Sequence, residues 1–274
     1  MQTRNKKRIA CISVFAVLIV GLLLYEFLLK KVLFTELGEW ERGMTDMLIT
    51  RLIGGGIFLC FTVYLGYRVL NPITKPVGKN MLYILPALCV AINNMPIIPL
   101  VLGQSEITAG YDKILLLLGE CLAVGFFEEM AFRSVVMLGI MENRRKNKKD
   151  IVIAVVISSI VFGLVHLINL FISPSGMVIL QILYSALIGA MCSVVLLLTR
   201  NIWACVALHG LFNFSGAIVS ECGTGRGFFD DIPTQIVTAV IAIIVIVIYV
   251  ICFVKYDVSL SDGFYPKKNK QREK

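Results

Sequence analysis

Two adjacent carboxylates and an arginine lie inside an apolar stretch of the sequence, "VGFFEEMAFRSVV" at residues 124–136. A charged side chain at the centre of a bilayer costs roughly 2.5–3.5 kcal/mol even on lenient insertion scales. Residues four apart share a helix face, whereas adjacent residues point about 100° apart. Glu129 and Arg133 are therefore expected to form a supporting ion pair. Glu128 has no cation on its own helix, and this makes it our candidate general base.

The two histidines of the chain lie in other apolar stretches. In "VFGLVHLINLF" Phe162 and His166 share a helix face, and in "IWACVALHGLFNFSG" His209 and Asn213 do. A glutamate and a histidine from different helices suit the binding and deprotonation of a water. A His/Asn pair offers two donors to one point, which suits an oxyanion hole. Together these residues predict hydrolysis of a peptide bond by an activated water.

The elements that must position these residues are membrane spans. The chain is 58% apolar and only 16% charged, whereas about 25% of residues are charged in a typical soluble domain. The apolar residues form long runs, which is typical of α-helical spans and not of the alternating segments of an outer-membrane barrel. We expect an all-α polytopic protein with eight spans, at residues 9–29, 48–67, 81–102, 114–141, 151–172, 177–199, 202–220 and 235–254.

The basic residues set the expected orientation. With the N-terminus inside, most of the 26 Lys and Arg residues fall in cytoplasmic connectors, including "NRRKNKK" at residues 143–149. The positive-inside rule then places both termini in the cytoplasm. The net charge of +8 is thus explained by topology and attraction to lipid, and no nucleic-acid partner is expected.

Three motifs in this order resemble the CPBP (CAAX protease and bacteriocin-processing, or Abi) family of intramembrane proteases, which includes the Ras-converting CAAX endopeptidases. They are "EEMAFR" as EExxxR, "FGLVH" as FxxxH and "HGLFN" as HxxxN. The resemblance covers residues 114–220, whereas the N-terminal spans are similar in hydropathy alone. It implies that Glu128 and His166 activate the water. It further implies that His209 and Asn213 stabilise the oxyanion, with Glu129, Arg133 and Phe162 in support, and that the site opens toward the cytoplasm.

Two alternatives stay open at this stage. Glu128, His166 and His209 would form a His₂Glu set, a common catalytic zinc arrangement, although no HExxH motif is present. We expect no cofactor, with zinc as the alternative. A non-enzymatic transport or immunity protein is the second alternative, and the lack of matching polar residues in the first three spans disfavours transport. Glu120 has no assigned role.

The remaining expectations concern organisation and setting. We expect one membrane domain over residues 1–274, with a catalytic core at 114–220 and a basic cytoplasmic tail at 255–274. The first apolar run is too long for a signal peptide, so it is expected to be retained. "GGG" at 54–56 permits close helix packing, and "INNMPIIP" at 92–99 is expected to kink or break its span. The expected partners are a membrane-associated peptide or protein substrate and the lipid bilayer, in a prokaryotic cytoplasmic membrane.

Overall fold

The computed structural model describes residues 36–71, 77–142, 147–172 and 177–266, together with the isolated positions Ile9 and Ser13. The α-helices are α2 (Glu39–Leu65), α3 (Val77–Asn93), α4 (Ile97–Val101), α5 (Tyr111–Glu129), α6 (Leu138–Glu142), α7 (Lys148–Val165), α8 (Asn169–Ile172), α9 (Met177–Thr199), α10 (Ile202–Cys222) and α11 (Ile232–Val254). Shorter or tighter elements are the π-helix η2 (Met130–Met137) and the 3₁₀ turns η3 (His166–Ile168), η4 (Phe228–Asp230) and η5 (Val258–Phe264). Strands β1 (Ser105–Ile107) and β2 (Gly223–Gly225) pair antiparallel. The all-α prediction is confirmed.

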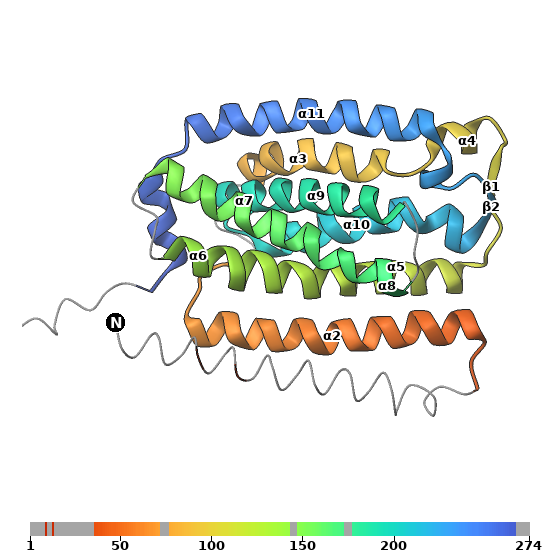
Figure 1. The fold of residues 1–274 in the computed structure, drawn as a ribbon, viewed down its shortest axis with the longest axis horizontal. Coiled ribbons are helices and arrows are strands. Elements are labelled where there is room, and N and C mark those ends of the chain that lie inside the picture. Colours follow the sequence, from red (N-terminus) through yellow and green to blue (C-terminus); the bar gives the residue numbers. More distant parts are fainter. Residues whose placement is uncertain are drawn as a thin grey trace, which may run out of the picture.

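The long helices lie roughly side by side along one direction, with α2 at one edge of the bundle and α11 at the opposite edge (Figure 1). Helix α5 packs between α2 and α10, and α7 packs against α9. The small β1–β2 sheet joins the loops at one end of the bundle, and α6 lies at the other end. The two ends therefore differ in construction.

Five of the described helices are long and apolar enough to cross a membrane, at Glu39–Leu65, Lys148–Ile168, Val178–Thr199, Ile202–Cys222 and Ile232–Val254. They match five of the expected spans, which supports an integral membrane protein. The expected span 81–102 is broken: α3 ends at Asn93, before the "MP" of the predicted break, and α4 continues at Ile97. The expected span 114–141 consists of α5, η2 and α6 in succession. The expected first span, at 9–29, lies outside the described residues.

Side-chain caps fix where three of these helices begin. The Asn147 side chain accepts from the backbone N–H of Asp150 at the start of α7, and the Asn201 side chain accepts from Trp203 and Ala204 at the start of α10. Asp231 caps α11 in the same way. Short polar side chains are favoured here because the first N–H groups of a helix have no partner within it.

Glycines allow the central helices to approach closely. A Cβ atom on Gly54 would lie 2.7 Å from the ring of Phe127, and one on Gly55 would clash with the ring of Phe126. The "GGG" segment therefore does bring α2 against α5, as expected. At the crossing of α5 and α10, a Cβ atom on Gly125 would lie 2.9 Å from the backbone nitrogen of Gly210. This crossing places Glu128 and Glu129 beside His209.

The end of the bundle that carries α6 is closed by the C-terminal segment. Turn η5 packs there with Phe264 fully buried, and the Tyr265 hydroxyl donates to the backbone oxygen of Leu138 at 2.8 Å. The Arg200 guanidinium lies 5.7 Å from the centre of the Phe264 ring. The first part of the predicted basic tail is thus folded onto the helices.

Candidate active site

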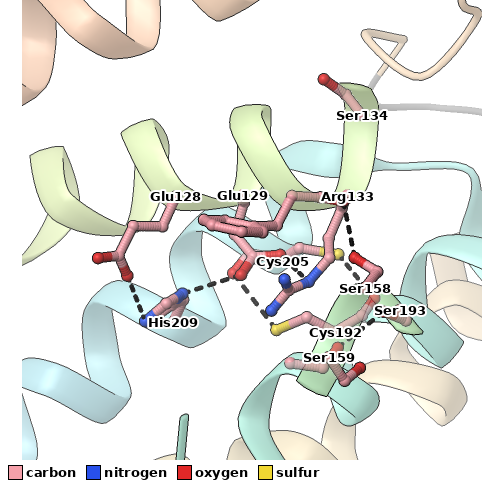
Figure 2. A network of polar contacts seen from close by, with 12 residues as sticks. Glu128, Glu129, Arg133, Ser134, Ser158, Ser159, Cys192, Ser193, Cys205 and His209 are labelled. Atoms are coloured by element: carbon pink, nitrogen blue, oxygen red, sulfur yellow. Dashed lines mark hydrogen bonds and ion pairs between the residues drawn. The ribbon is translucent and has the colours of Figure 1, made fainter. Parts of the chain in front are cut away.

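A chain of charged contacts joins α5 to α10 in the interior of the bundle (Figure 2). The Nε2 atom of His209 lies 3.3 Å from Oε2 of Glu128, and its Nδ1 atom lies 2.9 Å from Oε1 of Glu129. The second oxygen of Glu129 lies 3.0 Å from Nε of Arg133. Both ring nitrogens of one imidazole thus face carboxylates.

The Glu129–Arg133 pair is completely buried, with both side chains 0% exposed. The guanidinium carbon of Arg133 lies 4.7 Å from the centre of the Phe162 ring, a cation–π contact. A Cβ atom on Gly189 would lie 2.9 Å from the NH2 nitrogen of Arg133, so α9 has a glycine where the guanidinium needs room. The spacing argument predicted this pair, and the structure contains it.

Glu128 faces a different environment from Glu129. Its side chain is 15% exposed and lines a cavity of about 550 Å³, and the cavity lining does not include Glu129 or Arg133. The sequence predicted this division between the two carboxylates. It did not predict that His209 would contact both of them, because its expected roles were as an oxyanion donor or, in the alternative, as a zinc ligand.

A π-helix follows the two carboxylates directly. Segment η2 begins at Met130, and its widened turns leave backbone carbonyl oxygens for other partners. Ser158 of α7 donates to the backbone oxygen of Phe132 at 3.0 Å, and Ser134 donates to that of Met130 at 2.6 Å. These hydroxyls stabilise the irregular backbone that carries Arg133. Nothing in the sequence pattern distinguished this segment from an α-helix.

His166 lies at the end of α7, in the 3₁₀ turn η3. Its Nδ1 atom lies 3.1 Å from the backbone oxygen of Phe162, and its Nε2 atom lies 3.5 Å from the hydroxyl of Ser185. A Cβ atom on Gly163 would lie 2.7 Å from the backbone oxygen of Ile182, and this close contact fixes α7 against α9. His166 therefore shares the cavity with Glu128 but has its polar contacts on α7 and α9.

The Phe162 ring packs against both histidines. Its centre is 5.3 Å from that of His166 and 5.6 Å from that of His209, and both contacts are edge-to-face. Phe162 thus contacts both imidazoles and the Arg133 guanidinium at once. A supporting role for Phe162 stays a prediction.

The cavity brings the predicted residues of three spans together. Its lining includes Glu128, His166, His209 and Asn213. Polar residues that the sequence analysis missed also line it: Asn94, Asn169, Gln181, Tyr184, Ser185 and Glu221. Asn94 donates to the backbone oxygen of Phe212 at 2.8 Å. The signal in the sequence for these lining residues was a polar side chain within an apolar span. Several residues without a functional role carry the same signal.

Glu120 also lines the cavity. It is not part of the series of charged contacts that joins α5 to α10. It lies close enough to Arg51 of α2 for an electrostatic interaction between them. The Arg51 guanidinium lies 4.9 Å from the centre of the Phe127 ring. Glu120 is thus a residue of the cavity wall, with its countercharge on a neighbouring helix.

The donor atoms of the proposed zinc set do not converge. Among the residues that the structure describes, one group of three possible ligands lies within 4.8 Å, and it consists of Glu129, Cys192 and Cys205. Both oxygens of Glu129 already contact His209 and Arg133. Glu128, His166 and His209 do not form such a group, so the arrangement gives the zinc alternative no geometric support.

One comparison with known proteins identifies the region that contains this site. Residues 110–215 match the family model described as Rce1-like, type II CAAX prenyl endopeptidase. The match spans α5 to most of α10 and includes all seven residues singled out in the three motifs. No curated protein and no solved structure matches the chain. Residues 110–215 are therefore similar to this protease family.

Proposed function

We propose that this membrane protein, with its Rce1-like domain at residues 110–215, is an intramembrane endopeptidase that hydrolyses peptide bonds with a water activated by Glu128. The observation that carries the proposal is that Glu128, His166, His209 and Asn213 line the same cavity, of about 550 Å³. These residues come from three helices far apart in sequence. The substrate is a membrane-associated peptide or protein, and the bilayer is its setting.

In the first step, Glu128 and His166 bind a water in the cavity beside the scissile carbonyl. Glu128 accepts a proton from this water as its oxygen attacks the carbonyl carbon. Its position supports this role, because one carboxylate oxygen contacts His209 while the side chain remains partly accessible to the cavity. Glu129 lacks such access.

In the second step, His209 and Asn213 donate to the oxyanion of the tetrahedral intermediate. The Nε2 atom of His209 faces Glu128 in the resting cavity at 3.3 Å. Once Glu128 has taken the proton of the water, its carboxyl no longer competes for the N–H of His209. That N–H is then available to the oxyanion at the moment when negative charge develops there.

In the third step, the C–N bond breaks and the amine nitrogen takes the proton from Glu128. The carboxylate is thereby restored, and no residue changes its net protonation over the cycle. Glu129 and Arg133 act as positioning residues. Glu129 accepts from Nδ1 of His209 and so fixes the orientation of the ring, while Arg133 compensates the buried charge of Glu129.

We further propose one membrane domain over residues 1–274, with eight spans and both termini in the cytoplasm. In this arrangement residues 114–220 form the catalytic core. The described helices supply five spans by length and composition alone. Helix α3 and the α5–η2–α6 succession supply two more if they also cross the bilayer. No metal is required by the steps above.

The experiment compares wild-type protein with Glu128→Gln in cells that express either one. Membrane peptides are collected and their new termini identified by mass spectrometry. We expect a set of termini that depends on the wild-type protein and disappears with Glu128→Gln. Glu106→Gln, in strand β1 away from the cavity lining, is the matched control and is expected to retain these termini. An unchanged set of termini in Glu128→Gln would refute the proposed mechanism.

A further inference from the structure

We infer that the cavity receives its substrate from the non-cytoplasmic side of the membrane, as a neutral or basic peptide segment presented at that surface. The peptide nature of the substrate rests on the proposed function. The direction of entry rests on the difference between the two ends of the bundle. We name the end with β1, β2 and η4 the open end. The end with α6, the turn between α9 and α10, and η5 is the closed end.

The cavity lies in the half of the bundle next to the open end. It is lined by the first half of α2, the second half of α10 and the last turn of α7. Its lining reaches Ser220, Glu221 and Phe229, which are exposed to the surroundings at this end. The strands that define the open end follow directly after α10 and precede α5 (Figure 1). The mouth is therefore at the open end.

The other half of the bundle offers no comparable route within the described residues. Phe162 and Ile188 line the cavity and are 1% and 2% exposed. Where η2 passes into α6 toward the closed end, the side chains of Met137, Leu138 and Met141 are fully buried. The docked η5 segment covers this end, with Phe264 at 0% exposure. The interior is close-packed there, and packed interiors exclude a peptide chain.

The two ends carry opposite charge. Described charged residues at the closed end are Arg68, Lys79, Lys148, Lys149, Arg200 and Lys255, with Glu142, Asp150, Asp257 and Asp262. Those at the open end are Glu36, Glu39, Glu41, Glu106, Asp112, Glu221, Asp230 and Asp231, with Arg42, Lys113 and Arg226. The positive-inside rule places the basic, closed end in the cytoplasm.

Two expectations from the sequence are therefore incompatible. The basic connectors were expected in the cytoplasm, and the family resemblance implied a cytoplasmic opening. The structure puts the basic connectors and the mouth at opposite ends, so one expectation must fail. We retain the first, because it rests on the charges of this chain and the second rests on resemblance alone.

The charge of the cavity wall restricts which peptide segments can bind as substrate. The lining includes the carboxylates of Glu120, Glu128 and Glu221, with the Arg51 guanidinium and the imidazoles of His166 and His209 as its basic groups. Trp40 donates to Glu221 at 2.9 Å and holds it at the mouth. Like charges repel strongly in surroundings of low dielectric constant. An acidic segment is therefore disfavoured in the cavity, and a neutral or basic segment is favoured.

The test is the sidedness of two introduced cysteines in intact cells. Ser220→Cys reports on the mouth and Lys149→Cys on the closed end, and both positions are exposed. A membrane-impermeant maleimide is expected to label Ser220→Cys in intact cells, and Lys149→Cys only after permeabilisation. The wild-type chain gives the background from native cysteines. The opposite pattern would overturn the inference.

A second measurement links the mouth to catalysis. Maleimide-labelled Ser220→Cys is expected to produce the termini dependent on this protein at least tenfold more slowly than the unlabelled variant. Undiminished cleavage after complete labelling would overturn the mouth as the entry route. Labelling patterns do not depend on activity. A failure of the proposed function in Glu128→Gln is thus distinguishable from a failure of the inferred direction.

Discussion

Glu128 and Glu129 are adjacent in sequence, yet they belong to two different regions of the molecule. Glu128 faces the cavity and is 15% exposed, whereas Glu129 is fully buried among α5, α9 and α10. His209 contacts both. The comparison teaches that a rotation of about 100° between adjacent residues can separate a carboxylate that lines the cavity from one that is buried in an ion pair. Substitution of Glu128 is therefore expected to change cleavage, whereas loss of the partner of Glu129 is expected to change stability.

The largest expected effect comes from the isosteric exchange of Glu128. Glu128→Gln removes the proposed base without changing volume, and cleavage is expected to fall by roughly 10²–10⁴-fold, the usual contribution of general base catalysis. The thermal unfolding midpoint in detergent is expected to stay close to that of wild type. Rates are measured as the appearance of protein-dependent termini. A marked loss of stability in this variant would mean that Glu128 also has a structural role.

Arg133→Met tests the buried ion pair between Glu129 and Arg133. It leaves Glu129 as an uncompensated charge in an apolar interior, and removal of one partner of a buried pair typically costs about 3–5 kcal/mol. We expect a lower unfolding midpoint and less folded protein in the membrane. The double variant Arg133→Met/Glu129→Gln is expected to recover part of the stability, because no charge is then left alone. Equal stability of the single and double variants would contradict the ion-pair role.

Gly189→Ala tests the same buried ion pair by adding a methyl group beside Arg133. The added Cβ atom would lie 2.9 Å from NH2 of Arg133 and 3.1 Å from a carbon of the Phe162 ring. Overpacking of this kind costs about 1–3 kcal/mol. The matched control is Gly56→Ala in α2, whose Cβ atom would meet nothing within 4 Å. The two variants are compared by thermal unfolding, and equal midpoints would show that the guanidinium can shift at no cost.

Tyr265→Phe addresses the closed end and has a smaller expected effect. It removes the hydrogen bond from the Tyr265 hydroxyl to the buried backbone oxygen of Leu138. The expected cost is about 1 kcal/mol of unfolding free energy. Cleavage by the folded fraction is expected to remain unchanged, because this contact is far from the cavity lining. A selective loss of activity at full stability would show coupling between the closed end and the site.

Treatment with a strong zinc chelator is expected to have no effect on cleavage. The donors of Glu128, His166 and His209 do not converge as a metal site would require. Metal content of the purified protein is measured alongside the rates. Loss of activity on chelation, with recovery on addition of zinc, would restore the zinc alternative.

The sequence predicted the parts of this molecule that depend on helical periodicity. The spacing of Glu129 and Arg133 gave their ion pair, and the prolines and asparagines after residue 91 gave the break at the end of α3. Helix spacing also gave the separation of Glu128 from Glu129. Each of these features is determined within a single helix, where positions four apart always share a face.

Features that depend on contacts between helices were not predictable in the same way. The contact of His209 with both carboxylates depends on how deeply α10 crosses α5 at Gly125 and Gly210. The π-helix η2 depends on hydroxyl partners such as Ser158, which lies on another helix. The position of the cavity mouth depends on how far along each helix the lining residues lie, and therefore on how all the helices pack together. Periodicity contains none of this information.

Phe162 joins three helical segments of the site through one side chain. Its ring is T-shaped to both imidazoles, at 5.3 and 5.6 Å between ring centres. It also lies 4.7 Å from the guanidinium carbon of Arg133. A change in the size of this one ring would therefore disturb His166 of η3, His209 of α10 and Arg133 of η2 at the same time.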